Sequence, residues 1–216
     1  MDWMRPIDAY CERSDPSFWA EPVNALTNAA FLVAAAVMWP RVAGMPMARA
    51  LCVVLGLIGI GSFLFHSLAN AVAGLADVLP ILGFILLYLY VAHRRFWGLG
   101  RWSALTLSAA FLPYAAVLAP LFGMLPGLGS SAGYAPVALL IGIHALLLRG
   151  RAPATAAGLG LGAGVLSVSI VFRSLDEPLC AAIPLGTHFL WHVLNAIMLA
   201  WVIEVYRRHE TACAQS

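Results

Sequence analysis

Seven apolar stretches occupy most of this chain of 216 residues, and each is long enough to cross the hydrocarbon core of a membrane as a helix. They lack the alternating polarity of barrel strands, and in lipid only helices and closed barrels satisfy every backbone hydrogen bond. The sequence therefore predicts an all-α, integral membrane seven-transmembrane helix bundle that forms a single domain over residues 1–216. The predicted spans are residues 23–43, 50–69, 72–92, 103–123, 132–148, 153–173 and 184–205.

The distribution of charge predicts how this bundle sits in the membrane. Nine of the 12 arginines fall in the connections after the first, third and fifth spans or behind the seventh, whereas five acidic residues precede the first span. The positive-inside rule then places residues 1–22 outside as an extracytoplasmic acidic segment and residues 206–216 inside as a cytoplasmic tail. Abundant alanine and glycine, with arginine in place of lysine, favour a bacterial inner membrane.

Three histidines fall at the same predicted depth, near the outer end of the bundle. His188 and His192 are spaced i, i+4 at the start of the seventh span, so both imidazoles project from one helix face. His66, near the end of the second span, can complete a set of three nitrogen ligands for Zn²⁺ at about 2.0 to 2.1 Å. Three protein ligands leave a fourth position for water, which is typical of catalytic zinc. Copper, nickel or iron also accept such ligands, and three packed histidines that each bond a backbone carbonyl are the alternative.

Two polar residues accompany these histidines. Ser62 lies one helical turn before His66, so its hydroxyl can enter the same cavity and donate to an oxyanion, or can bond its own i−4 carbonyl. Asp77 begins the third span at the same level and is either a proton acceptor or an orienting partner of a ligand histidine. The sequence leaves both choices open. The other histidines fall at the inner end and are predicted to be interfacial or structural: His93, His144 and His209.

These residues resemble the alkaline ceramidase family, which belongs to a wider superfamily of seven-helix hydrolases that includes adiponectin receptors and GPI-lipid remodelling enzymes. The resemblance covers nearly the whole chain and depends on the motifs YCER, AEPVNALTN, GSFLFH, the DVLP run that starts at Asp77, and HFLWH. It implies that Ser62, Asp77 and the three histidines form an active site in which a zinc-activated water hydrolyses the amide of ceramide to a sphingoid base and a fatty acid. Asp77 then receives the proton and passes it to the departing amine, while Ser62 stabilises the oxyanion.

The same resemblance extends to a calcium site in the acidic N-terminal segment. Eukaryotic alkaline ceramidases bind calcium there through acidic side chains and backbone oxygens, and Glu12 and Glu21 match two of the acidic positions. The spacing between them is shorter in this chain and Ser14 stands two residues after Glu12, so Asp15 is the candidate substitute ligand. A solvated acidic segment without calcium is the alternative.

One pair of cysteines can form a disulfide on the predicted outer, oxidising side. Cys11 precedes the first span and Cys180 lies between the sixth and seventh, whereas Cys52 and Cys213 fall on the inner side. The family resemblance favours a bond between Cys11 and Cys180, with free thiols as the alternative.

Three classes of function compete on this sequence. The first is a zinc-dependent amidohydrolase of ceramide or a related lipid, and the second is a zinc-dependent ester hydrolase that remodels phospholipids. The third is a metal-binding receptor or transporter without turnover, although few polar residues line the inner half of the spans and the loops offer little surface for a protein partner. No lysine occurs, so the sequence shows no Lys/Arg-rich stripe that would bind nucleic acid. The expected partners are the lipid bilayer and a ceramide-like lipid.

Overall fold

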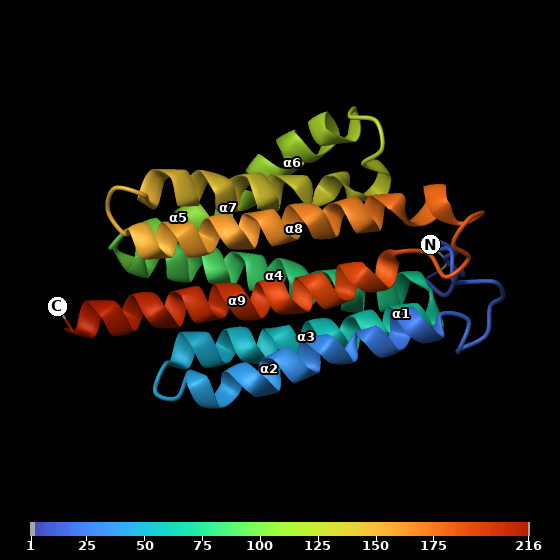
Figure 1. Cartoon of the computed structure of the whole chain (residues 1–216), viewed down its shortest axis with the longest axis horizontal. Coiled ribbons are helices and arrows are strands. Elements are labelled where there is room, and N and C mark those ends of the chain that lie inside the picture. Colours follow the sequence, from blue (N-terminus) through green and yellow to red (C-terminus); the bar gives the residue numbers. More distant parts are fainter. Residues whose placement is uncertain (1–2, 216) are drawn as a thin grey trace.

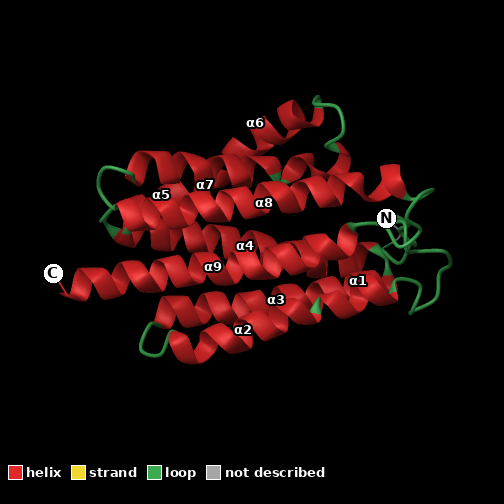
Figure 2. Ribbon diagram, in the orientation of Figure 1, coloured by secondary structure: helices red, strands yellow, loops and turns green. Residues whose placement is uncertain are grey.

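The computed structural model describes residues 3–215, and within that range every regular element is a helix (Figures 1 and 2). The N-terminal segment and the end of the last helix lie at opposite ends of an elongated bundle, as an odd number of spans requires (Figure 1). The elements are α1 (Pro22–Thr27), α2 (Ala29–Arg41), α3 (Pro46–Leu68), α4 (Ala71–Arg95), α5 (Arg101–Ala109), α6 (Phe111–Gly123), the 3₁₀ turn η1 (Gly129–Gly133), α7 (Ala135–Leu148), α8 (Pro153–Leu179) and α9 (His188–Gln215).

Seven segments of the described chain are long and apolar enough to cross a membrane, which confirms the predicted all-α, seven-span bundle. Three of these spans are composite: α1 and α2 form the first, α5 and α6 the fourth, and η1 and α7 the fifth. The end of the bundle that carries the N-terminal segment is called the site end below.

Two helices continue furthest beyond the C-terminal ends of their predicted spans. α8 extends to Leu179 and α9 to Gln215, so the predicted cytoplasmic tail is helical in its described part. Near the last buried turn of α9, the carboxylate of Glu204 binds Arg207 and Arg208 at 2.8 Å each. These i, i+3 and i, i+4 ion pairs stabilise the helix as it leaves the buried part of the bundle.

The outer surface of the bundle is apolar, as contact with lipid requires. Val117, Leu146 and Ile197 are 64%, 64% and 56% exposed, and many other large apolar side chains are exposed in the same way. In a water-soluble protein such a surface would be a strong aggregation hazard. α9 packs against α1, α2, α3 and α8 and therefore lies at the centre of the bundle.

Glycines bring α8 and α9 close together. A Cβ at Gly158 would lie 2.6 Å from Val205 Cγ2, and one at Gly162 would lie 3.2 Å from Val202 Cγ1. A side chain at Gly158 would force Val205 to move, and one at Gly162 would be tightly packed, so the two glycines allow the helix backbones to approach closely, as is common between helices in membranes.

A third glycine sets the distance between α3 and α4. Gly61 immediately precedes Ser62, and a Cβ built on it would overlap the backbone carbonyl of Ala76, the residue before Asp77. The absence of a side chain at Gly61 therefore brings the two predicted catalytic residues of these helices together.

We expect Gly61→Ala to force α3 and α4 apart and to lower the free energy of unfolding by about 1–3 kcal/mol. Gly56→Ala on the same helix is the matched control, because its Cβ would meet only Leu32 Cδ2 at an ordinary 3.8 Å. Both variants are compared with the native chain by denaturant unfolding in one detergent. Equal stabilities of the two variants would contradict the close crossing at Gly61.

Candidate metal centre

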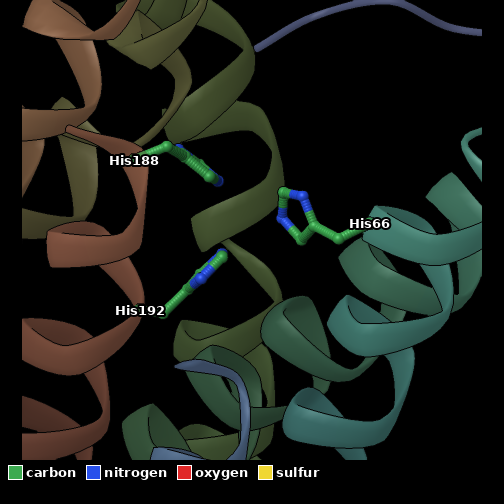
Figure 3. Close-up of side chains that lie close together, drawn as sticks. All are labelled: His66, His188 and His192. Carbon is green, nitrogen blue, oxygen red and sulfur yellow. The ribbon is translucent and has the colours of Figure 1, made fainter. Parts of the chain in front are cut away.

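The three predicted ligand histidines converge at the site end of the bundle (Figure 3). His66 comes from the last turn of α3, and His188 and His192 come from the start of α9, with the rings facing one another. Their candidate ligand nitrogens lie within 4.8 Å of one another. The ring centroids are 4.6 Å apart for His188 and His192, 4.7 Å for His66 and His192, and 5.1 Å for His66 and His188. Over residues 3–215, no other group of three or more histidine, cysteine or acidic side chains gathers in this way.

Two nitrogens of this group are buried without a hydrogen-bond partner: His188 Nδ1 and His192 Nε2. The three side chains are only 1–2% exposed, and an unpaired polar atom at such depth costs about 1–3 kcal/mol. Coordination to a metal ion would remove this cost. The residues therefore fit a metal ion, and their nitrogen donors suit zinc as well as copper, nickel or iron.

Neighbouring side chains orient two of the histidines through their second ring nitrogens. His192 Nδ1 lies 3.0 Å from Thr27 Oγ1, and His66 Nδ1 lies 2.6 Å from Glu21 Oε2. Arg13 Nε donates to the other carboxylate oxygen of Glu21 at 2.5 Å. Burial by itself raises the pKa of Glu21, but the hydrogen bond from His66, followed by the hydrogen bond and charge of Arg13, outweighs burial and holds this pKa below its ordinary value. An ionised carboxylate can only accept, so His66 donates from Nδ1 and keeps Nε2 for a metal ion.

Because Glu21 orients His66, we expect Glu21→Gln to weaken the binding of zinc by about 10- to 100-fold. Glutamine keeps the volume of the side chain but removes the charge that fixes the proton on Nδ1 of the ring. The affinity is measured by titrating metal-free protein with zinc against a competing chelator. Glu177→Gln is the matched control, because this acid is exposed near the end of α8. Equal affinities of the two variants would show that Glu21 does not orient the ligand.

The acidic residues predicted for calcium have separate partners. Both carboxylate oxygens of Glu12 accept backbone N–H groups at the start of α1, at 2.6 and 2.7 Å, and so cap that helix. Asp15 Oδ1 accepts the backbone N–H of Ser17 at 2.7 Å, while Glu21 faces His66. Within the described chain, Glu12, Asp15 and Glu21 do not form a group of converging ligands. A calcium site stays a prediction from the resemblance alone.

Asp176, buried near the end of α8, is not among the residues that the sequence predicts for the site, yet it fixes the start of α9. Its Oδ1 accepts the backbone N–H groups of Thr187 and His188 at 2.7 and 2.8 Å, and its Oδ2 accepts the N–H of Cys11 at 3.1 Å. A carboxylate at a helix N-terminus satisfies free N–H groups and opposes the positive end of the helix dipole. Asp176 therefore determines where His188 begins its turn.

A disulfide joins Cys11 to Cys180, with the Cα atoms 5.3 Å apart, which confirms the predicted pair. It ties the N-terminal segment to the connection between α8 and α9. In that connection Gly186 has a φ of +69°, and a Cβ there would overlap the Asp176 carboxylate, so only glycine fits. Tyr10, next to Cys11, stacks on His188 with ring centroids 3.8 Å apart. The N-terminal segment is thus packed directly onto the histidines.

The structure also brings Ser62 and Asp77 to this centre. Ser62 is 4% exposed and lies one turn before His66 on α3. Asp77, on α4, lies close enough to interact with the Ser62 hydroxyl and with His66. All five residues predicted for the active site therefore share one location, and their catalytic roles stay predictions.

The remaining histidines lie apart from this centre, in the half of the bundle away from the site end. Each has its own partner within the chain: Ser108 Oγ for His93 at 3.1 Å, the Leu140 carbonyl for His144 at 2.9 Å, and Thr155 Oγ1 for His209 at 2.8 Å. These contacts are those of packed structural residues, which is one of the two roles that the sequence predicts.

Apolar cavities extend from the level of the metal centre into the bundle. One is lined by Trp191 and Asn195, which flank His192 on α9, and a second reaches Tyr88 and His144. The two share a lining of apolar residues: Phe84, Ile85, Val137, Met198 and Leu199. The lining is apolar, but each cavity has a volume of only about 50 Å³, so a hydrocarbon chain would fit there only after neighbouring side chains move apart.

The centre thus combines nitrogen ligands for a metal ion, a carboxylate that can accept a proton, and a hydroxyl that can donate a hydrogen bond. Sequence comparison with protein-family models and with curated proteins gives no match to this chain. The function must therefore be inferred from the chemistry of the site itself.

Proposed function

We propose that this protein is a zinc-dependent intramembrane amidohydrolase that cleaves the N-acyl bond of ceramide or a related lipid to a sphingoid base and a fatty acid. One observation carries the proposal: three buried imidazoles, two of them with an unpaired nitrogen, lie beside one carboxylate and one hydroxyl. Structural zinc has four protein ligands, whereas three ligands beside an acid are typical of catalytic zinc. The resemblance to alkaline ceramidases supports an amide lipid as the substrate.

Each side chain of the centre has a separate role in the hydrolysis. A zinc ion held by His66, His188 and His192 would supply a Lewis acid that lowers the pKa of water to about 7. Asp77 accepts the proton of the attacking water and returns it to the amine nitrogen, which leaves readily only when protonated. Ser62 donates its O–H to the oxyanion that develops on the carbonyl oxygen. The acyl carbon gains the hydroxyl of water, and the amine gains the proton.

The surroundings of the centre suit a substrate that stays in the membrane. Its acyl chain would lie along the apolar surface between α4, α7 and α9, near Trp191 and Asn195, where the present cavities would have to widen to hold it. A lipid with two chains then reaches the centre without leaving the bilayer. The arginine distribution supports a centre in the outer half of the membrane, and the composition supports a bacterial inner membrane.

The test uses detergent-purified protein and two lipids that share one acyl chain, ceramide and a phospholipid ester. Mass spectrometry follows the fatty acid and the amine or alcohol released from each. We expect ceramide to be cleaved, cleavage to stop after removal of metal with a chelator, and zinc to restore it. Cleavage of the ester alone would replace the proposal with a phospholipid remodelling enzyme. Bound zinc without cleavage of either lipid would favour a receptor.

A further inference from the structure

A single arginine, Arg173, is held inside the site end by aromatic rings. It lies on α8, within the sixth span, and is half-buried. Its guanidinium carbon is 5.2 Å from the ring centroid of Tyr134, 5.6 Å from that of Trp191 and 6.0 Å from that of Tyr10. Ring faces attract a cation but do not neutralise it.

The hydrogen bonds of Arg173 go only to neutral groups, and Asp77 acts on its charge from beyond ion-pair distance. One terminal nitrogen donates to Ser130 Oγ at 2.8 Å and to Ser131 Oγ at 3.1 Å, and the other donates to the Tyr10 hydroxyl at 3.4 Å. Every acceptor is a neutral hydroxyl. Among residues 3–215, no carboxylate lies within ion-pair distance of the guanidinium. An ionised side chain inside a membrane span is costly, and it usually faces a binding partner.

Arg173 also lies next to the metal centre. Tyr10, which it contacts, stacks directly on His188. The guanidinium is close enough to interact electrostatically with Asp77 and with His192. The Ser130 side of the group is exposed. An anionic group of a ligand that approaches from that side would therefore contact the guanidinium. Another part of the same ligand would then reach the histidines.

We propose that Arg173, with the hydroxyls of Ser130 and Ser131, binds an anionic group on the polar part of the lipid substrate. The preferred substrates are then N-acyl lipids that carry a carboxylate or a phosphate near the amide, rather than neutral ceramide. This inference rests on the proposed function, because it names the substrate class of that centre. The planar fork of arginine can hold two oxygens of either anion, whereas lysine would offer only a point charge.

The kinetic test uses four lipids with the same acyl chain: ceramide, ceramide 1-phosphate, an N-acyl serine and its methyl ester. We expect kcat/KM to be roughly 10- to 100-fold higher for ceramide 1-phosphate than for ceramide, and for the N-acyl serine than for its methyl ester. This factor corresponds to the free energy that a hydrogen bond to a charged group contributes. Arg173→Gln should bring this ratio close to one, and Arg173→Lys should give an intermediate ratio. Phosphate and carboxylate lipids are compared separately, which shows which anion is preferred.

Arg101→Gln is the matched control, because Arg101 makes a similar contact with Trp102 at 4.7 Å but begins α5, which follows the end of α4 away from Asp77. It should leave the ratio unchanged. No preference for anionic lipids in the native protein would overturn the inference. An equal loss for charged and neutral lipids in Arg173→Gln would also overturn it, because Arg173 would then act only by positioning Tyr10 or Asp77.

A binding measurement separates this inference from the proposed function. The thermal midpoint of the zinc-loaded protein is measured with dodecyl phosphate, dodecanoate or dodecanol, none of which contains an amide. We expect an anionic amphiphile to stabilise the native protein more than dodecanol does, and Arg173→Gln to abolish the difference. That result would support the anion site even if no N-acyl lipid were cleaved. Equal stabilisation by all three amphiphiles in both proteins would overturn the anion site even if ceramide were cleaved.

Discussion

Replacing His192 by alanine is expected to remove nearly all bound metal and, with it, all hydrolysis of lipid. The variant keeps two ligands at most, and the imidazole it loses is one whose Nε2 is buried without another partner. Since zinc sites depend on the full ligand set, we expect the metal content to fall from about one ion per chain to a small fraction of that. Metal is measured by mass spectrometry on protein purified without added zinc.

His144→Ala is the matched control for this loss. His144 lies in an apolar part of the bundle and bonds only the carbonyl of Leu140 among its described hydrogen bonds. Its removal should cost some stability but no metal. If both variants retained the native metal content, the three histidines would not be the ligand set and the proposed centre would be refuted.

The second large effect is expected for Asp77→Asn, which should lower kcat by about 10²- to 10⁴-fold while the zinc remains bound. Asparagine can still interact with the Ser62 hydroxyl but can neither accept nor return a proton. Turnover is measured at saturating zinc and lipid, beside the metal content of the same sample. Asp8→Asn, at an exposed position of the N-terminal segment, is the control.

This pair of measurements decides between the two roles that the sequence leaves open for Asp77. If Asp77 is the proton acceptor, its replacement lowers kcat and leaves the affinity for zinc unchanged. An orienting partner of a histidine affects zinc affinity, by about 10- to 100-fold, and turnover should recover when zinc is in excess. Full recovery at high zinc would therefore exclude Asp77 as the base.

The histidine set was predictable because its signals are local. Apolar length locates the spans, and the i, i+4 spacing of His188 and His192 fixes two ligands on one helix face. The orienting carboxylate was not predictable in the same way. Glu21 and His66 are 45 positions apart, and their contact exists only because α1 packs against α3. Without that packing, Glu21 is one more acid in an acidic segment.

The helix ends show the same limit of local signals. Hydropathy alone ends the sixth span near Arg173, because charged residues follow it. In the structure α8 continues past Asp176, whose carboxylate is satisfied by backbone groups from distant parts of the chain. Long-range hydrogen bonds therefore permit a buried charge that a hydropathy window treats as a boundary.

The order of the elements along the chain has a consequence for biosynthesis. During translation, His66 and Glu21 leave the ribosome early, whereas α9, which carries two of the three ligands, is the last of the described helices to emerge. α9 also fills the space between α2, α3 and α8. A nascent chain that has inserted six spans therefore holds only one of the three candidate ligands and lacks the helix that fills the centre. If the proposed function holds, metal binds only after the seventh span is inserted, and chains that terminate earlier cannot hydrolyse lipid.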